Sequence, residues 1–542
     1  MYPVLPEDMK KQLRFYFITD DSGGPAPLEQ VKAAILGGAT MVQYRNKVFD
    51  DRFFEEATAI LRLCRANRVP FIVNDDPVLA LALGANGVHV GQADGSLKTA
   101  RSIVGKNALV GVSVSTLDEL ARTSIAFCDY IGTGPVFATG TKPDASPVIG
   151  VAGLKAVIER SKKPVAAIGG INAANAPACL SAGAAGVAVI SCVSRVDDPL
   201  EGARSLAEAC GIEVFPEKLE LPWNDEFALI DRLLAGDKNA NAAEEEILKV
   251  GPGDDTAVLH TLKTPVLTTD AHVENVHFSF SWQRPREVGQ KAVAVVFSDL
   301  AAAYARPVAL FVNLTLPHDR PESLALELYE GLREGLGACR CVLGGGNLSG
   351  GREVALNLFA VGEARAPFYP SRANARPGDD LYCTGPLGRA RAGLLALQGG
   401  LEGYASLVSA FKFPRARFDA AVVLADHNVR CVMDISDGLA GDARHIARAS
   451  GITICFDVDA AACSDDLRRF CDKTGNRPGE MIFSGGEDYE LLFACPPETA
   501  RRIGDVMPVY RLGRCVSFDG EYLRGLPEGV TPFQHGHAGS GG

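Results

Sequence analysis

The sequence predicts an α/β fold in which a (β/α)8 TIM barrel is followed by an α+β part with two subdomains. Between Arg14 and Ser191, short runs of β-forming residues alternate with helix-like stretches, as in parallel βαβ units. The predicted strands are Phe15–Thr19, Met41–Arg45, Phe71–Asn74, Val88–Gly91, Val110–Val114, Tyr130–Thr133, Val165–Ile168 and Val187–Ile190. Eight such units in so short a segment suit a compact barrel, whose functional residues follow the carboxyl ends of the strands.

Beyond the barrel, the alternation changes to longer helices and strands, which predicts an α+β arrangement. Helices Pro285–Ala305 and Pro321–Gly337 are expected to alternate with strands Val308–Leu316 and Val354–Val361. A chain of 542 residues is also too long for a single hydrophobic core, and its proline-rich segments indicate the boundaries. We predict the barrel at residues 1–212, a linker at 213–223, subdomains at 224–366 and 367–536, and a flexible tail at 537–542.

Composition excludes several classes of protein. The formal net charge of -12 argues against a nucleic-acid binder, so any phosphate site must be local or bridged by metal. Apolar stretches are interrupted before about 18 residues, and the N-terminus lacks the features of a secretory signal, so we expect a cytoplasmic protein without a membrane span. The 14 cysteines lack zinc-site spacing and are expected to be buried thiols without a disulfide framework.

The second predicted strand carries a basic face. Side chains alternate along a strand, so Gln43, Arg45 and Lys47 lie on one face of the strand and its exit. Two cations and an amide then converge at the barrel mouth. An amphipathic strand with a merely solvated basic face is the alternative interpretation.

Carboxylates follow the next two strands. Asn74 and Asp75 come directly after the third strand and Asp94 follows the fourth, so all three should reach the same mouth as Arg45 and Lys47. Acidic oxygens for a hard cation and basic donors for phosphate oxygens are what a Mg²⁺-diphosphate requires. Structural salt bridges remain the alternative.

Glycine-rich loops supply further phosphate-binding groups. The loop Gly132–Lys142 after the sixth strand offers hydroxyls, backbone amides and one lysine. Gly169-Gly170-Ile171 and Ile190-Ser191 follow strands seven and eight, where many such barrels bind a phosphate on backbone amides. Each segment by itself is also compatible with an ordinary loop.

Taken together, these segments resemble the thiamine-phosphate synthase family over the first 210 residues. The matching motifs are Gln43-x-Arg45-x-Lys47, Asn74-Asp75, Gly87-Val88-His89-x-Gly91-Gln92-x-Asp94, Gly111-Val112-Ser113, the loop Gly134-Pro135 to Lys142, and Ala167-Ile168-Gly169-Gly170-Ile171. The resemblance implies that hydroxymethylpyrimidine diphosphate is joined to a thiazole phosphate, with release of diphosphate. This reaction does not require a protein nucleophile.

The same resemblance implies roles for individual residues. Asp75 and Asp94 would hold Mg²⁺. Arg45, Lys47 and Lys142 would be catalytic and, with Gln43 and Asn74, would bind the diphosphate. Ser113 would lie beside the pyrimidine, and Thr139 and Thr141 would help to close the loop. The thiazole phosphate would rest on Gly170, Ile190 and Ser191.

The second part of the chain is rich in carboxylates at loops and element ends. These are Asp254, Asp255, Asp270, Asp299 and Asp437. There is neither a P-loop nor a protein-kinase signature, but phosphoryl transfer depends mainly on alignment and on Mg²⁺ between the phosphates. For any one aspartate, a helix cap or a turn is the alternative.

This part resembles thiamine-monophosphate kinase, of the aminoimidazole-ribonucleotide-synthetase-like superfamily, from Glu226 to about Phe533. The matching motifs are Thr268-Thr269-Asp270 with Val276-His277-Phe278, Lys291-Ala292 to Ser298-Asp299-Leu300-Ala301-Ala302, Thr384 to Gly388, Asp434-Ile435-Ser436-Asp437-Gly438-Leu439, and Ser484-Gly485-Gly486-Glu487-Asp488-Tyr489-Glu490-Leu491. The resemblance implies Mg²⁺ at the five aspartates, His277 and Asp488 near thiamine phosphate, ATP as phosphoryl donor, and a homodimer formed through the first subdomain.

One corner of this second pattern departs from the family. Gly345 to Gly350 stand where the family usually has Gly-Gly-Asp-Thr-Thr-Arg, so Asn347 replaces a carboxylate and would be a weaker metal ligand. Val296 and the pair Ala303-Tyr304 also differ from the usual residues. A degenerate nucleotide-binding module is therefore the alternative for this part, and a thiazole tautomerase is the alternative for the barrel.

The two implied reactions are consecutive. The product of the first, thiamine phosphate, is the substrate of the second. The sequence therefore predicts a bifunctional enzyme of thiamine biosynthesis that makes thiamine phosphate and then thiamine diphosphate from small-molecule substrates.

Overall fold

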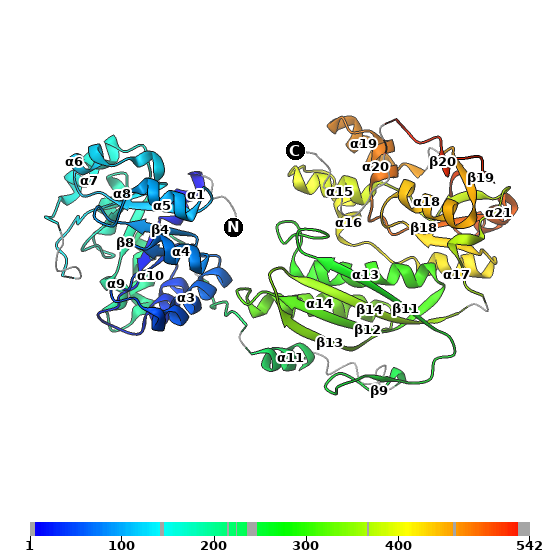
Figure 1. Ribbon diagram of the computed structural model, residues 1–542, viewed down its shortest axis with the longest axis horizontal. Coiled ribbons are helices and arrows are strands. Elements are labelled where there is room, and N and C mark those ends of the chain that lie inside the picture. Colours follow the sequence, from blue (N-terminus) through cyan, green and yellow to red (C-terminus); the bar gives the residue numbers. More distant parts are fainter. Residues whose placement is uncertain are drawn as a thin grey trace. The chain divides into compact units, whose positions relative to one another are not determined.

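The computed structural model describes residues 6–140, 146–213, 216–223, 225–235, 246–365, 368–458, 462–528 and 530. The chain forms two compact units. The first comprises Met1–Asn224 with His318–Glu322, and the second comprises Asp225–Pro317 with Ser323–Gly542. In Figure 1 the barrel of the first unit runs from blue to cyan, and the second unit runs from green to red.

The first unit contains a closed barrel of parallel strands in sequence order, which confirms the predicted TIM barrel. Its strands are β1 (Phe15–Ile18), β2 (Met41–Tyr44), β3 (Phe71–Asn74), β4 (Gly87–Val90), β5 (Leu109–Ser113), β6 (Tyr130–Thr133), β7 (Val165–Ile168) and β8 (Gly186–Val189). β1 pairs with β8 and closes the barrel. The predicted strands differ from these bounds by a single residue at most at either end.

Helices surround the barrel. They are α1 (Pro6–Gln12), α2 (Pro27–Leu36), α3 (Phe54–Ala66), α4 (Pro77–Leu83), α5 (Leu97–Val104), α6 (Leu117–Arg122), α7 (Gly150–Arg160), α8 (Ala176–Ser181), α9 (Ser191–Ser194) and α10 (Pro199–Ala209), with short 3₁₀ turns at Asp51–Phe53 and Ile125–Phe127. Side-chain caps start several of them. Asp76 accepts hydrogen bonds from the amides of Val78 and Leu79, and Ser96 accepts one from Thr99. These caps fix where each strand-to-helix loop ends.

The barrel has two apolar layers because side chains alternate along each strand. Tyr16, Ile72 and Tyr130 belong to the cluster inside the barrel. Phe17 and Tyr44 belong to the larger cluster between strands and helices. The inner layer therefore carries two tyrosine hydroxyls beneath the mouth.

The second unit is α+β, as predicted, and its sheets are antiparallel or mixed. Its first part contains α11 (Glu226–Ala235), β9 (Leu248–Val250), β10 (Val258–Leu259), β11 (Pro265–Val273), α13 (Pro285–Ala302), β12 (Ala305–Leu316), α14 (Glu322–Ala338), β13 (Val342–Gly350) and β14 (Ala355–Ala364). The main sheet has the order β11-β14-β12-β13. Helix α13 packs on β11, β12 and β14 (Figure 1).

A six-stranded sheet with the order β16-β18-β15-β19-β17-β20 organises the rest of this unit. The elements are a 3₁₀ turn at Arg372–Asn374, β15 (Asp380–Cys383), α15 (Arg389–Gln398), α16 (Ala405–Lys412), α17 (Phe418–Asp426), β16 (Cys431–Asp434), α18 (Leu439–Ser450), β17 (Ile452–Phe456), α19 (Asp465–Thr474), α20 (Pro478–Ser484), β18 (Leu491–Cys495), α21 (Pro497–Gly504), β19 (Tyr510–Ser517) and β20 (Leu523–Arg524). The first sheet ends at Ala364 and the second begins at Asp380, on either side of the predicted boundary.

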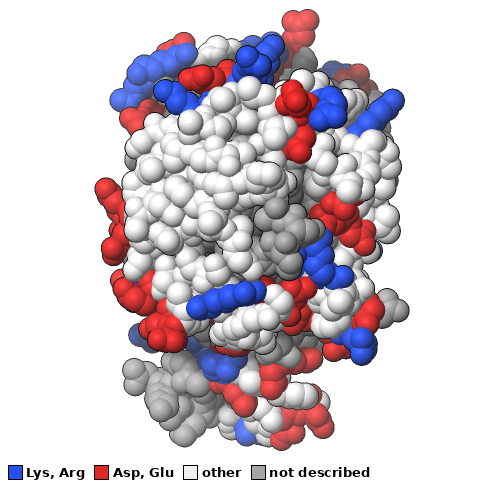
Figure 2. Space-filling view, turned by 90° about the vertical axis from the view of Figure 1, so that its left-hand side faces the viewer, with Lys and Arg blue, Asp and Glu red and all other residues white. Residues whose placement is uncertain are grey.

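Charge is unevenly distributed in the barrel. Residues 164–194, which include β7, α8 and β8, contain no Lys, Arg, Asp or Glu. Figure 2 shows a broad central area without charged side chains on one face of the molecule.

All 14 cysteines are free thiols. Within the described ranges, no helix is both long enough and apolar enough to cross a membrane.

Two glycines let α13 and α14 approach closely. A Cβ atom on Gly331 would lie 2.0 Å from the carbonyl oxygen of Arg286, and one on Gly289 would lie 2.1 Å from that of Leu328. Neither neighbour is a flexible side chain. The contact between the helices therefore requires glycine at both positions.

We predict that Gly331→Ala lowers the stability of the second unit by about 1–3 kcal/mol, because the helices must separate to admit the methyl group. Gly337→Ala is the matched control, since a Cβ on Gly337 of the same helix meets nothing within 4 Å. The control should be neutral or stabilising by up to about 1 kcal/mol. Calorimetry of the second unit's unfolding transition measures both, and equal effects would contradict the packing argument.

Candidate functional sites

A cavity of about 210 Å³ opens at the carboxyl ends of the barrel strands. Of the residues predicted for the barrel site, those that line it are Gln43, Arg45, Lys47, Asn74, Asp75, Asp94, Ser113, Thr139, Gly170, Ile190 and Ser191. Thr141 and Lys142 lie outside the described residues. The fold therefore gathers side chains from seven loops or strand ends around one cavity.

The mouth contains an ion pair built around Asp75. The ammonium group of Lys47 donates to Asp75 Oδ2 at 2.8 Å, and Asn74 Nδ2 donates to the same oxygen at 2.6 Å. The backbone of Asp75 has φ 63°, a left-handed conformation that turns this carboxylate back towards the cavity. Burial tends to raise the pKa of Asp75, but its bonds, that with Lys47 foremost, hold it below the usual value.

Asp94 lies against Asp75. Burial and the contact with the Asp75 carboxyl group both raise the pKa of Asp94, although the amide of Gly91 donates to Asp94 Oδ2 at 2.8 Å. Two carboxylates in contact repel each other unless a proton or a cation lies between them. Mg²⁺ is commonly held by one or two carboxylates together with substrate phosphate oxygens, so this donor set fits the ion.

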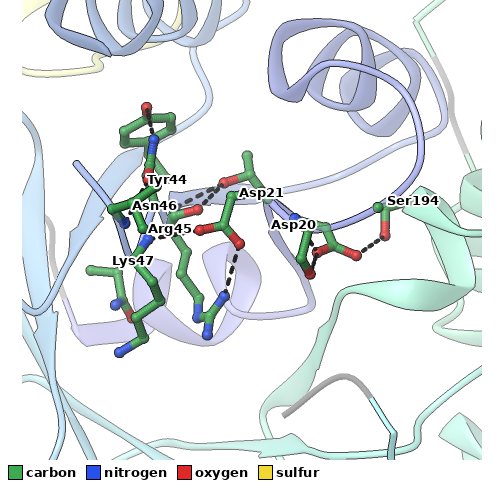
Figure 3. Close-up of polar contacts among 12 residues, drawn as sticks. Asp20, Asp21, Tyr44, Arg45, Asn46, Lys47 and Ser194 are labelled. Atoms are coloured by element: carbon green, nitrogen blue, oxygen red, sulfur yellow. Dashed lines mark hydrogen bonds and ion pairs between the residues drawn. The ribbon is translucent and has the colours of Figure 1, made fainter. Parts of the chain in front are cut away.

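A third carboxylate orients the basic side of the mouth. Figure 3 shows Asp21 turned towards Arg45, with Arg45 Nη1 3.4 Å from Asp21 Oδ1. The backbone amide of Lys47 donates to Asp21 Oδ2 at 2.7 Å. Its neighbour Asp20 instead points towards Ser194 (Figure 3). Asp20 also accepts a hydrogen bond from Arg195 at 2.6 Å. The loop after β1 thus supports both the basic strand and the segment after β8.

The turn after β7 is shaped by its glycines. Gly169 and Gly170 have φ 97° and 64°, and a Cβ on Gly170 would lie 2.4 Å from the carbonyl oxygen of Ala138. A side chain at either position would push away the loop after β6. The glycines therefore allow two predicted phosphate-binding loops to pack together.

A chain of buried polar groups crosses the barrel beneath the mouth. Gln43 Nε2 donates to the Tyr16 hydroxyl at 2.6 Å. The Tyr16 hydroxyl in turn lies 2.9 Å from the Tyr130 hydroxyl. His89 Nδ1 lies 3.2 Å from the Tyr130 hydroxyl, and His89 Nε2 lies 3.0 Å from Ser113 Oγ. Burial raises the pKa of Tyr130 well above its usual value, so its hydroxyl stays protonated. This chain fixes the orientation of Gln43 and Ser113.

In the second unit, the predicted acidic residues occupy two places. Asp254, Asp255 and Asn347 line one pocket of about 300 Å³ together with the glycines 344–346. The other three, Asp270, Asp299 and Asp437, lie with Asp434 around β16 and the end of α13. There the Thr268 hydroxyl donates to Asp299 Oδ2 at 2.5 Å, and burial together with Asp299 raises the pKa of Asp434 to about 6.

Tyr489 marks the centre of this second group. Burial is the main reason why the pKa of its hydroxyl is raised well above the usual value. The nearby carboxylates raise it further, and they belong to Glu487, Asp270, Asp434 and Asp437. Asp442 accepts hydrogen bonds from the amides of Ser436 and Asp437. Burial, Asp434 and Asp437 raise the pKa of Asp442 to about 8. Oxygen-rich surroundings with unbalanced negative charge fit Mg²⁺. Even so, within the described part of the chain no group of three or more His, Cys, Asp or Glu could by itself hold a metal ion.

The segment Ser484–Glu490 joins several elements through three acidic side chains, those of Glu487, Asp488 and Glu490. Glu487 pairs with Lys291 of α13, and Asp488 accepts the amides of Gly388 and Ala390 at the start of α15. Glu490 pairs with Arg417 and accepts a bond from the Thr384 hydroxyl at 2.6 Å. Both oxygens of Asp488 are therefore engaged by backbone amides.

His277 lies close to the buried His272, with ring centroids 5.7 Å apart, and its Nδ1 accepts a bond from the amide of Val273. Desolvation, with lesser effects of Lys291 and His277, lowers the pKa of His272 well below its usual value. His272 is therefore neutral. The contact of His277 with thiamine phosphate remains a prediction.

Several residues of these sites were not identified from the sequence as functional. Asp21 follows the first strand just as Asp75 follows the third, so the same positional rule could have found it. Tyr16 and Tyr130 carry no such signal, because their hydroxyls meet only when the barrel closes. Asp442 lies in a helix and looks like an ordinary helical residue in the sequence. Lys291 begins one of the motifs that carry the resemblance, but no role was predicted for it.

Comparisons with known proteins agree with the predicted family of each half of the chain. A family model for thiamine monophosphate synthase matches residues 15–193. Models for the N-terminal and C-terminal domains of AIR synthase related proteins match residues 253–364 and 376–517.

Individual relatives divide in the same way. Thiamine-phosphate synthase of Chloroflexus aurantiacus is 47% identical over 196 residues, which cover 36% of this chain and 90% of the relative. Thiamine-monophosphate kinase of Aquifex aeolicus is 34% identical over 315 residues, which cover 57% of this chain and 97% of the relative. A solved structure of AaThiL complexed with AMPPCP and TMP is 32% identical, covers 55% of this chain and 91% of that chain, and has a TM-score of 0.44.

We predict that the metal-free second unit loses stability as the pH rises from about 6.5 to about 8.5. Burial raises the pKa of Asp488 to about 7 and that of Asp442 to about 8. Both values exceed the unfolded value of about 3.9, so in this window the folded state holds protons that the unfolded state has already released. His272 has the opposite effect, but only below its unfolded pKa of about 6.5.

Denaturation midpoints across this range, with a chelator and with excess Mg²⁺, measure the effect. Mg²⁺ should flatten the dependence, because a cation near Asp437 offsets the carboxylate repulsion. Asp442→Asn should flatten it without Mg²⁺. A metal-free midpoint that rises with pH would contradict this account.

Proposed function

Since the chain belongs to the thiamine-phosphate synthase family in its barrel and to the thiamine-monophosphate kinase family in its second unit, we propose that it catalyses two consecutive steps of thiamine diphosphate synthesis. The barrel condenses hydroxymethylpyrimidine diphosphate with hydroxyethylthiazole phosphate. The second unit then phosphorylates the resulting thiamine phosphate with ATP. The observation that carries the first step is the cluster of Arg45, Lys47, Asp75 and Asp94 around one cavity.

In the first step, the bond between the pyrimidine methylene carbon and the diphosphate oxygen breaks, and the thiazole nitrogen bonds to that carbon. The electron-rich aminopyrimidine stabilises positive charge on the methylene. Arg45 and Lys47 offer donors to the departing diphosphate, and Asp21 keeps Arg45 turned towards it. Mg²⁺ bound at Asp75 and Asp94 would neutralise further charge on the leaving group.

The remaining lining residues account for the two organic substrates. Ser113 and Gln43, held from below by the buried polar chain, face the pyrimidine diphosphate. Gly170, Ile190 and Ser191 offer backbone amides to the thiazole phosphate. Lys142 would bind the diphosphate, and Thr139 and Thr141 would help to close the loop after β6; Thr141 and Lys142 lie outside the described residues.

In the second step, a phosphate oxygen of thiamine phosphate attacks the γ-phosphate of ATP, and ADP leaves. Asp270, Asp299 and Asp437, with Asp254 and Asp255, are the residues that would hold Mg²⁺. His277 and Asp488 would lie near thiamine phosphate. We further propose a cytoplasmic homodimer formed through residues 224–366.

Asn347 supports a second candidate for this unit. It is exposed in the pocket of Asp254 and Asp255, where an amide is a weaker ligand than the family's carboxylate. A nucleotide-binding module without turnover would tolerate this substitution. For the barrel, a thiazole tautomerase would not need the diphosphate-binding groups, so their convergence in one cavity favours the synthase.

The purified chain, incubated with both phosphorylated precursors and Mg²⁺, should release diphosphate and form thiamine phosphate. Addition of ATP should convert this to thiamine diphosphate, and a chelator should stop both steps. Absence of thiamine phosphate would refute the barrel assignment. When thiamine phosphate is supplied directly, ATP binding without turnover would instead support the non-catalytic module.

We predict that Asp75→Asn lowers the rate of thiamine phosphate formation at least about 100-fold, because the carboxylate that meets both Lys47 and Asp94 is lost. Asp76→Ser is the matched control, since Asp76 caps α4 through its side chain and serine can replace that cap. The control should keep its rate within about threefold. An equal loss in both variants would show that the loop itself, and not the Asp75 carboxylate, limits the reaction.

A further inference from the structure

Lys291 is a fully buried lysine that no role considered so far explains. Its side chain is 0% exposed, in the middle of α13. The ammonium group lies 3.0 Å from Glu487 Oε2 and 3.8 Å from the centroid of the Phe411 ring. Burying an ammonium group costs several kcal/mol unless a close partner offsets the loss of water. The placement of the pair is therefore tightly determined.

The partner of Lys291 belongs to a strained loop. Glu487 and Tyr489 have φ 66° and 51°, in the left-handed region that side chains other than glycine rarely adopt. Such a backbone persists only where the surroundings hold it. Here Glu487 is tied to α13, while its neighbour Asp488 is tied to the start of α15. The loop is thus held from two sides.

Helix α13 connects this pair to the acidic group. Asp299 lies near the carboxyl end of α13, eight residues after Lys291, and bonds to Thr268 of β11. Tyr489, two residues after Glu487, is surrounded by Asp270, Asp434 and Asp437. The bond between Lys291 and Glu487 therefore joins the helix that carries one proposed metal ligand to the loop that lies against three other carboxylates.

We propose that Lys291 is a positioning residue of the kinase, which acts through Glu487 to hold the loop 484–490 in register with α13 for binding thiamine phosphate. The inference rests on the proposed kinase function. Lys291 has no exposed atoms, so it touches neither substrate. Its effect is on the geometry of the loop, and it should appear in the affinity for thiamine phosphate more than in that for ATP.

A second lysine pair on α13 offers a matched control. Lys412 lies 2.9 Å from Glu287 Oε2, and Glu287 belongs to the first turn of the helix. This pair also joins α13 to a later segment of the unit, but it does not involve the loop 484–490. A merely structural role for such pairs predicts similar effects when either lysine is replaced.

The test compares Lys291→Met with Lys412→Met in the full chain. Lys291→Met should raise KM for thiamine phosphate, and its Kd measured by calorimetry without ATP, at least about tenfold, with KM for ATP within about twofold. Lys412→Met should leave these constants unchanged. The rate of thiamine phosphate formation by the barrel, measured in each preparation, reports on its integrity.

If Lys291→Met does not fold, the double variant Lys291→Met/Glu487→Gln removes both charges while nearly keeping their shapes. A raised KM for thiamine phosphate in this folded variant supports the proposal. Recovery of wild-type KM there would overturn it, since the pair would then serve stability alone. An equal effect of Lys412→Met would also overturn it. Failure of the wild-type chain to phosphorylate thiamine phosphate would refute the kinase function itself, a result distinct from these.

Discussion

Repulsion between carboxylates held close together is the constraint on which both functional sites depend. At the barrel mouth, Asp75 and Asp94 touch, and Lys47 donates a hydrogen bond to Asp75. In the second unit, burial and the neighbouring Asp434 and Asp437 raise the pKa of Asp442, and burial and Asp299 raise that of Asp434. Such groups destabilise the fold unless a cation offsets the repulsion. The folded chain therefore holds mutually repelling carboxylates at the barrel mouth and around Tyr489, and a metal-bound phosphate at either site would reduce this repulsion.

The rest of each unit serves to hold these charges in place. In the barrel, Asp21 orients Arg45, and the hydroxyls of Tyr16 and Tyr130 support the groups above them. In the second unit, the loop 484–490 attaches to α13, α15 and Arg417 through its three acidic residues. Close approaches that only glycine permits, as at Gly331, let the supporting helices pack. Positioning in both units thus comes from buried polar bonds as well as from apolar packing.

Most of the fold could be predicted from the sequence because its signals are local. The barrel strands are short apolar runs separated by capped helices, and each was placed to within one residue. The boundary that the proline and arginine content predicts near residues 366–377 lies between the last strand of one sheet, β14, and the first strand of the next, β15. The pairing order of the two later sheets was not predictable, since β11 ends at Val273 and β14 begins only at Ala355, and no local signal links the two strands.

The sequence alone determined which chemical groups are present and which strand ends carry them, because the period of a strand and the geometry of a parallel barrel place Arg45, Lys47, Asp75 and Asp94 at one mouth. Only the tertiary structure decided how these groups are balanced. The contact of Asp75 with Asp94, the support from Tyr130 and the burial of Lys291 beside Glu487 all join residues distant in the sequence. Their energies depend on burial and on distances of a few ångströms, which no local pattern encodes.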